Sequence, residues 1–270
     1  MIYVTGDTHG EYGRLIEFNK TLKSGDYIIV CGDWGYIFLN NESENKLLDD
    51  VAEKPWTMLF VDGNHENHPA INLYPQEIWN GGKIHRIRKN IIHLCRGQVF
   101  EVENKKFFTF GGAYSIDKAL RIEGYSWWKD EMPTDADFVE ANKNLDAHNR
   151  EVDYIITHTA PEETMNIFHP DHIHEKPLNN FLEYVRESVK YKHWYMGHLH
   201  RDEDVCVNVK MKMYKNADSK CTILAKYSQI GYNLSGSDEN ELQKRHLREG
   251  EFYENDFVSC RGIRDNRQQT

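Results

Sequence analysis

The chain has 270 residues and a formal net charge of −10 at pH 7, with 33 Lys and Arg residues against 43 Asp and Glu residues. This length is enough for one large domain, and no run approaches the roughly 20 apolar residues of a membrane-spanning helix, so we expect no membrane insertion. The acidic balance argues against broad binding of nucleic acid, although a metal ion can supply the local positive charge that a small nucleotide needs.

The N-terminal part of the chain alternates predicted strands and helices. The elements are predicted, in chain order, at residues 2–5 (strand), 11–20 (helix), 27–31 (strand), 42–53 (helix) and 57–61 (strand). Each of these strands ends in a Gly-containing loop that carries polar side chains. Because ligands of α/β sheets bind in the crevice beyond the C-terminal strand ends, we expect a site there.

The middle of the chain predicts a second sheet and further helices. The expected elements lie at residues 90–94, 98–102 and 106–110 (strands), 134–150 (helix, with Thr134 as N-cap), 153–157 (strand), 177–190 (helix), 193–196 (strand), and 205–209 and 222–226 (strands). A long aromatic loop, residues 111–132, precedes the first of these helices. From residue 233 the chain is polar and poorly periodic. We therefore predict one domain over residues 1–232 and a polar C-terminal extension, residues 233–270, which can belong to the same domain.

Five short motifs carry side chains that can bind metal ions. They are, in order, Gly6-Asp7-Thr8-His9-Gly10, Gly32-Asp33, Gly63-Asn64-His65-Glu66, a lone His158 after an apolar strand, and Gly197-His198-Leu199-His200. Any one Asp or His at a strand end could simply bond to the backbone, but the ordered set indicates a site. In the last motif, alternate side chains of an extended segment point the same way, so both histidines can face one centre.

These residue types suit the hydrolysis of a phosphate ester. Two divalent ions about 3.5–4 Å apart can activate water and neutralise the charge that develops on phosphate. Such a centre needs one carboxylate that touches both ions, and Asp33 is the natural bridge. Further ligands can be the Asp7 carboxylate, the Asn64 carbonyl oxygen and several imidazoles.

The ordered motifs resemble the calcineurin-like metallophosphoesterase superfamily, whose pattern is GD-x-H, GD, GNH-[DE], H and GH-x-H. The resemblance covers Gly6 to His200. It implies an α/β fold, a four-layer αββα sandwich of two mixed β-sheets flanked by helices. It also implies one metal ion held by Asp7, His9, Asp33 and His200, and a second held by Asp33, Asn64, His158 and His198.

The same resemblance implies the reaction. A metal-bound hydroxide would attack phosphorus in line, and the catalytic residue His65 would protonate the leaving oxygen or stabilise the transition state. Glu66 would orient His65 or its loop. The two divalent ions are expected to be Mn²⁺, with Fe or Zn as alternatives, because N and O ligands without a thiolate accept all three.

Differences between this sequence and the family pattern narrow the class of expected substrates. Protein Ser/Thr phosphatases of this superfamily read LRGNHE, whereas Asp62 stands here in place of the phosphate-clamping arginine. Protein-phosphatase activity is therefore disfavoured, and the chain resembles the compact bacterial and phage phosphoesterases. We expect a small soluble phosphorylated substrate such as a nucleotide, as a mono- or diester. The alternatives are a metal-dependent nuclease and a catalytically silent scaffold that binds a protein partner.

Three further residues are candidates for substrate contacts. Arg121 could clamp a phosphate oxygen or form a surface ion pair. Trp34 and Tyr36 could offer a stacking face for a nucleobase or pack in the core beneath the site.

Cysteine usage favours a cytoplasmic protein. The five cysteines are scattered and include no C-x-x-C pair, so neither a disulfide framework nor a structural zinc site is indicated. The first four residues lead directly into the Asp7 motif, and we expect no signal peptide.

Overall fold

The computed structural model describes residues 1–170, 172–201, 204–207, 220–224 and 232–233. Met1–Leu234 form one compact unit, and every element named below belongs to it. Residues 234–270 lie outside the described part, so the extension at 233–270 stays a prediction.

The first sheet is mixed and has seven strands. Their order is β13 (Tyr232–Asn233), β1 (Ile2–Thr5), β2 (Tyr27–Cys31), β3 (Thr57–Val61), β6 (Ile91–Leu94), β5 (Gly82–Arg88) and β4 (Gln76–Trp79). β1, β2, β3 and β6 are parallel, whereas β13, β5 and β4 pair antiparallel with their neighbours. The parallel strands therefore end at a single edge, which carries the first three motifs.

The second sheet is also mixed and has six strands. Their order is β11 (Asp204–Val207), β12 (Lys220–Leu224), β10 (His193–Met196), β9 (Tyr154–Thr157), β8 (Lys105–Phe110) and β7 (Gln98–Val102). β12, β10, β9 and β8 are parallel, and β11 and β7 pair antiparallel at the two edges. β9 and β10 lead into the last two motifs.

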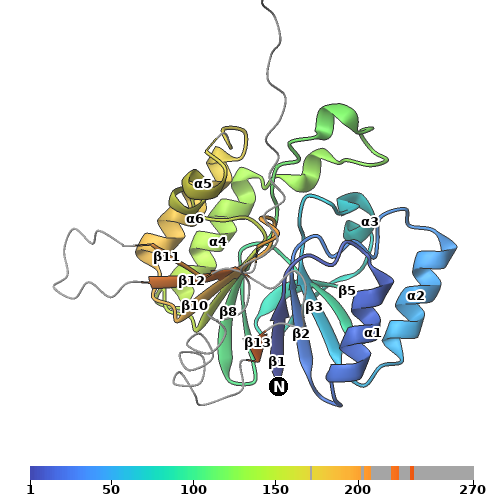
Figure 1. Ribbon diagram of the computed structural model, residues 1–270. Coiled ribbons are helices and arrows are strands. Elements are labelled where there is room, and N and C mark those ends of the chain that lie inside the picture. The colour runs from blue at the N-terminus through green and yellow to red at the C-terminus, as the bar shows by residue number, and fades with distance from the viewer. Residues whose placement is uncertain (171, 202–203, 208–219, 225–231, 234–270) are drawn as a thin grey trace, which may run out of the picture. The chain divides into compact units, whose positions relative to one another are not determined.

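Helices cover the outer face of each sheet (Figure 1). α1 (Tyr12–Thr21), α2 (Glu42–Ala52) and α3 (His68–Asn72) lie against the first sheet, and α4 (Asp135–Ala147), α5 (Glu162–Phe168) and α6 (Lys176–Ser188) lie against the second. Thr134 is the N-cap of α4, as predicted, and its N–H donates to the Asp137 carboxylate at 2.7 Å. Two short 3-10 turns, Lys118–Leu120 and Lys129–Glu131, interrupt the loop before α4.

Three buried apolar clusters separate the four layers. Within β2, Ile29 and Cys31 belong to the cluster between the sheets, whereas Ile28 and Val30 belong to the cluster under α1 and α2. Successive residues of a strand point to opposite faces, so a strand that is buried on both faces reads as a continuous apolar run. The third cluster, which includes Trp194, lies between the second sheet and its helices.

The predicted αββα sandwich of two mixed sheets is confirmed. The hairpin formed by β4 and β5 was not predicted, although Asn80 and Gly81 between two alternating segments are a typical hairpin signal. The described strands β11 and β12 overlap the predicted strands 205–209 and 222–226, and residues 208–209 and 225–226 lie outside the described part.

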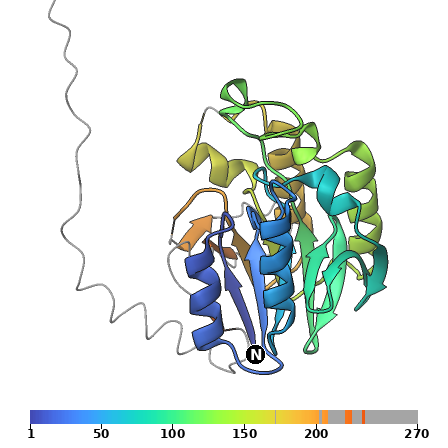
Figure 2. The same cartoon turned by 90° about the vertical axis from the view of Figure 1, so that its right-hand side faces the viewer.

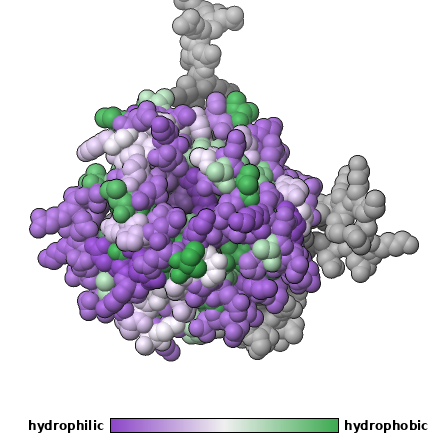
Figure 3. Space-filling model, turned by 180° about the vertical axis from the view of Figure 1, so that it is seen from behind, coloured by the Kyte–Doolittle hydropathy of each residue, from purple (hydrophilic) through white to green (hydrophobic). Residues whose placement is uncertain are grey.

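The surface of the described residues is mainly hydrophilic on the face seen from behind, with hydrophobic side chains in small separate patches (Figure 3). None of the helices in the described part of the chain has the length and hydrophobicity needed to cross a bilayer.

Candidate metal centre

The seven predicted ligands all follow the C-terminal ends of strands. Asp7 and His9 follow β1, Asp33 follows β2, Asn64 follows β3, His158 follows β9, and His198 and His200 follow β10. Figure 2 shows the N-terminus at the opposite end of the sheets from the loops that carry these residues. The two sheets thus contribute ligands to a common edge, as the α/β architecture leads one to expect.

The first group of ligands consists of Asp7, His9, Asp33 and His200, whose ligand atoms all lie within 4.8 Å of one another. The Nε2 atoms of His9 and His200 are 3.2 Å apart. His200 Nε2 lies 2.8 Å from Asp7 Oδ2, and His9 Nε2 lies 3.9 Å from Asp33 Oδ2. The side chain of His200 is 46% exposed, so this side of the centre is open to solvent.

The second group consists of Asp33, Asn64, His158 and His198. His158 Nε2 lies 3.1 Å from Asn64 Oδ1 and 3.3 Å from Asp33 Oδ1. The rings of His158 and His198 meet edge to face, with centroids 4.9 Å apart.

Asp33 stands between the two groups. Its Oδ1 faces His158, whereas its Oδ2 faces His9. The backbone N–H of His65 donates to Oδ1 at 2.7 Å and fixes the carboxylate in this orientation. One carboxylate therefore offers a separate oxygen to each group.

The spacing of the ligand atoms fits a bound cation. Donors about 2.0–2.2 Å from an ion and at right angles to each other lie roughly 3 Å apart, which is close to the contacts above. Asp7 Oδ2 is buried and makes no hydrogen bond of normal geometry, despite its short distance to His200. A buried carboxylate oxygen without a hydrogen bond is expected where a cation is its natural partner.

The pKa shifts of Asp7 and His198 favour their ligand forms, whereas Asp33 and Asp7 outweigh burial to raise the pKa of His158, and the contact with Asp7 raises the pKa of His200. Burial alone would raise the pKa of Asp7, but the close contact with His200 and the nearby His158 and His9 hold it at about 2. Burial, with His158 beside it, lowers the pKa of His198 to about 3, so its imidazole is neutral near pH 7. Both residues therefore present lone pairs to the centre.

His158 is oriented from behind. Its Nδ1 donates to the Cys31 carbonyl at 2.8 Å, and this bond directs Nε2 toward Asn64 and Asp33. Close approach also requires two glycines, because a Cβ atom at Gly63 would collide with the Asp33 side chain, and one at Gly197 would collide with Asp7.

Four of the seven predicted ligands have a left-handed backbone conformation. The φ angles are 46° for His9, 45° for Asp33, 64° for His198 and 50° for His200. Residues other than glycine adopt this region at a cost, and such residues cluster at functional sites.

Glu66 holds the loop that carries Asp33. Its carboxylate is buried and accepts hydrogen bonds from the backbone N–H groups of Trp34 at 2.5 Å and Gly35 at 3.2 Å. Burial, with Asp33 nearby, raises the pKa of Glu66 well above its usual value. The motif after β3 therefore supports the motif after β2.

Ser115 is a supporting residue that the sequence did not reveal. Asn64 Nδ2 donates to Ser115 Oγ at 3.2 Å, which turns the Asn64 carbonyl oxygen toward His158. The two residues are 51 positions apart, and no spacing rule connects them.

His65 and Arg121 lie together beside the centre. His65 Nε2 is 4.0 Å from Asp33 Oδ2 and 3.4 Å from Arg121 Nη2. Burial lowers the pKa of His65, and the Arg121 cation adds to this effect while Asp33 opposes it. Arg121 also donates two hydrogen bonds of 2.7 Å to Asp117. Its guanidinium therefore forms an ion pair and contacts His65 at the same time.

Trp34 and Tyr36 pack in the core rather than line the site. The Trp34 side chain is fully buried, and its ring stacks on Phe60 with centroids 4.0 Å apart. The hydroxyl of buried Tyr36 donates to the Glu11 carbonyl at 2.9 Å. A stacking face for a nucleobase requires an exposed ring, so this geometry fits the packing alternative.

Asp62 points away from the centre. It is buried, and its carboxylate contacts Arg96, His93 and His68. Burial by itself would raise the pKa of Asp62, but the Arg96 cation and the two histidines keep it well below its usual value. The acid at the position of the family's arginine is thus part of a separate polar network.

Comparison with known proteins places this geometry in context. The model of a family described as calcineurin-like phosphoesterase matches residues 1–202. None of the curated proteins matches the chain. Among solved structures, a phosphopantetheinyl hydrolase from Mycobacterium tuberculosis aligns over 87% of this chain and 96% of its own, at 13% sequence identity and a TM-score of 0.42. A likeness of this strength carries no information about the substrate.

Proposed function

This chain belongs to the calcineurin-like phosphoesterase family and is a metal-dependent phosphoester hydrolase, and on that basis we propose that it cleaves a phosphate mono- or diester of a small molecule, such as a nucleotide, at a centre of two divalent ions. The observation that carries the proposal is the position of Asp33, which turns one carboxylate oxygen toward each group of ligands. Bridging carboxylates are the usual link in two-metal sites.

The proposed ligands fall into two sets that share Asp33. Asp7, His9 and His200 complete the first, and Asn64, His158 and His198 complete the second. When bound, the ions would lower the pKa of a water so that it can attack phosphorus as hydroxide. They would also place positive charge opposite the phosphoryl oxygens. We propose Mn²⁺, with Fe or Zn as alternatives, because the donors of both sets are nitrogen and oxygen.

The chain's own residues then act on the substrate. Arg121 can donate to a phosphate oxygen, since its guanidinium only donates and already reaches the centre. His65 stands next to it and either protonates the leaving oxygen or donates to the transition state. Arg121 can donate to His65 Nε2 only while that imidazole is neutral, consistent with the lowered pKa, so His65 must release this contact and take up a proton before Nε2 can donate in either role.

The proposed substrate is small. Support comes from the net charge of −10, which disfavours a nuclease because neither strand of a duplex would be attracted to the surface as a whole. We also propose a cytoplasmic location, on the scattered cysteines, of which Cys31 and Cys95 are free in the structure.

The test is hydrolysis of chromogenic phosphate mono- and diesters with added Mn²⁺, followed by cyclic nucleotides, dinucleotides and phosphosugars. Asp33→Asn should abolish turnover, because it removes the shared charge. Asp49→Asn is the matched control, since Asp49 makes a surface ion pair with Arg88. Two bound ions with no turnover of any substrate would instead indicate a binding scaffold.

The same assay separates the two roles of His65. His65→Ala should keep its bound metal and lose roughly 10²–10⁴-fold in rate. If His65 is the acid, the loss will be much larger for a nucleoside leaving group than for a nitrophenolate, which departs without a proton. An equal loss for both leaving groups would assign His65 to the transition state, and loss of metal would make it a ligand.

A further inference from the structure

A second cluster of nitrogen and sulfur side chains lies on the hairpin formed by β5 and β6. His85 on β5 pairs directly with His93 on β6 in the antiparallel register. Cys95 directly follows the end of β6, and its N–H donates to the Lys83 carbonyl of β5 at 3.2 Å, so the pairing continues to this residue. Directly opposed residues share a face of the sheet, as do residues two apart in an extended chain, so all three side chains project from the same side.

The ligand atoms of this cluster converge. His85 Nδ1 and His93 Nδ1 are 3.0 Å apart, and Cys95 Sγ lies 3.7 Å from His85 Nδ1. All three atoms lie within 4.8 Å of one another. In a tetrahedral zinc site, bonds of about 2.0–2.1 Å to nitrogen and 2.3 Å to sulfur space the ligand atoms roughly 3.3–3.6 Å apart. The distances of 3.0 Å and 3.7 Å in this cluster are close to that spacing.

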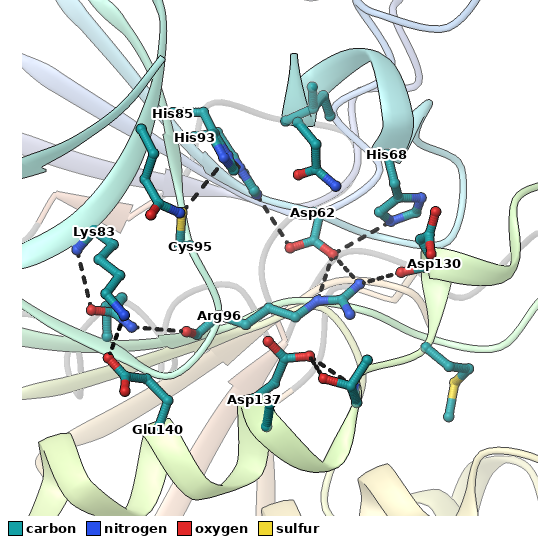
Figure 4. A pocket seen from close by; sticks show the side chains of 17 residues that line it. Asp62, His68, Lys83, His85, His93, Cys95, Arg96, Asp130, Asp137 and Glu140 are labelled. Carbon is teal, nitrogen blue, oxygen red and sulfur yellow. Dashed lines mark hydrogen bonds and ion pairs between the residues drawn. The ribbon is translucent and has the colours of Figure 1, made fainter. Parts of the chain in front are cut away.

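Asp62 orients His93 as a ligand. His93 Nε2 lies 3.2 Å from Asp62 Oδ1, while Arg96 holds the other oxygen of the same carboxylate through Nε at 2.9 Å (Figure 4). An ionised carboxylate only accepts, so His93 carries its proton on Nε2 and presents the Nδ1 lone pair toward His85. A carboxylate behind a histidine is a common support of metal ligands.

A cavity lies next to the cluster. Its volume is about 570 Å³, and its walls include His68 and Asp62 on one side and Asp137 and Glu140 of α4 on the other. Figure 4 shows the two parallel histidine rings and Cys95 at the edge of this space. A cation held by three protein ligands would therefore keep a fourth position that water or a small anion can reach.

We propose that His85, His93 and Cys95 bind a single Zn²⁺ ion, at a site separate from the phosphoesterase centre. Imidazole and thiolate donors suit this borderline-soft ion better than Mn²⁺ or Mg²⁺. The thiol gives its proton to solvent as the cation binds. The sequence contains no C-x-x-C pair that would indicate the site. Its ligands are brought together by the antiparallel register of the strands and not by their spacing in the sequence.

The alternative is a hydrogen bond between two neutral histidines, with Cys95 as a bystander. Cobalt distinguishes the two, because a thiolate bound to Co²⁺ gives a charge-transfer band in the near ultraviolet that imidazole and carboxylate ligands do not. The proposed phosphoesterase ligands include no thiol, so this band does not arise from the phosphoesterase centre.

Full-length protein titrated with Co²⁺ should develop this band, with the final intensity of one thiolate-bound cobalt per chain. Cys95→Ser should abolish it, whereas Cys31→Ala and Asp33→Asn should retain it. Cys31 is a matched control because it is also a free cysteine and is buried between the sheets. Retention in Asp33→Asn separates this result from the proposed function. A band that is absent from the wild type, or that persists in Cys95→Ser, would overturn the proposal.

A second measurement uses the wild-type protein, so its result does not depend on whether a variant folds. Zn²⁺ should slow the alkylation of Cys95 by iodoacetamide at least tenfold, as followed by mass spectrometry of the wild type. His93→Ala should lose this protection while keeping the wild-type circular dichroism. Equal alkylation of Cys95 with and without Zn²⁺ would contradict the site.

Discussion

Glu175 is a carboxyl group in a nearly water-free position at the start of α6. It is only 3% exposed, and it accepts a hydrogen bond from the Tyr114 N–H at 3.1 Å. Burial raises its pKa to about 7, although hydrogen bonds from Tyr114, Thr159 and Asn179 and the nearby His158 oppose this shift. Among the described residues it is an unusual acid, one that folding keeps protonated near neutral pH.

This shift makes stability depend on pH. Between the ordinary pKa of 4.5 and the folded value of about 7, the folded chain holds a proton that the unfolded chain has released. The free energy of unfolding therefore falls as pH rises through this range, and the full loss above pH 7 is roughly 3 kcal/mol. Glu175→Gln should match the wild type below pH 4.5 and exceed its stability by up to that amount at pH 8.

Urea unfolding of chelator-treated protein from pH 4 to pH 8 measures this difference. Glu187→Gln, at an exposed position on the same helix, should show a constant difference from the wild type. A constant difference for Glu175→Gln as well would show that the carboxyl group is ionised in the folded chain.

Single residues of the centre differ in how far the sequence specifies them. The place of Asp33 and His158 at the common edge could be predicted because short motifs follow strand ends there, and their role as ligands stays a prediction. Ser115 could not, because its contact with Asn64 depends on where the loop after β8 returns. The burial of Trp34 depends on its packing against Phe60, which its own motif does not reveal.

At the scale of elements, the loop after β3 holds the loop after β2 in place. Glu66 in the loop after β3 accepts from two backbone N–H groups in the loop after β2. Glu66→Ala should cost about 2–4 kcal/mol, because both donors would be buried without partners. It should also weaken Mn²⁺ binding roughly 10–100-fold by releasing Asp33. Glu66→Gln, which keeps an acceptor, should lose less.

Glu44 provides the control for Glu66. It also accepts from backbone N–H groups, those of Phe38, Leu39 and Asn40, but at a loop where water can replace it. Glu44→Ala should therefore cost about 1 kcal/mol. Equal losses in both variants, measured by urea unfolding and Mn²⁺ titration, would show that the Glu66 clamp has no special role.

Strands could be predicted from the sequence where a single hydrophobic pattern dominates a segment. β1, β2 and β3 lie where apolar runs predicted them, because strands buried on both faces leave little alternative. β4 and β5 were missed because their alternation is mixed with charged residues, as in Gly82–Arg88. This omission had a consequence, since β5 carries His85.

At the scale of the whole described unit, the centre joins the two sheets. Asp7, Asp33 and Asn64 come from the first sheet, and His158, His198 and His200 come from the second. Any ion that binds only the folded chain stabilises it, by about 2.7 kcal/mol at a concentration 100 times Kd. Mn²⁺ should therefore raise the midpoint of thermal unfolding by roughly 5–10 °C, and a chelator should reverse the change.

Calorimetry with and without Mn²⁺ tests this expectation, with Asp33→Asn as the control that should show little shift. A wild-type midpoint that does not respond to Mn²⁺ or Zn²⁺ would mean that these side chains do not cooperate in binding an ion.

The left-handed backbone at His9, Asp33, His198 and His200 sets stability against activity. Each such residue costs roughly 1–2 kcal/mol relative to a relaxed backbone, a penalty that glycine would escape. Selection for stability alone would therefore favour replacement of these four side chains, and the proposed hydrolytic activity would be lost. Variants that tolerate heat better and no longer hydrolyse anything should be easy to isolate from a random library, and their changes should concentrate at these positions.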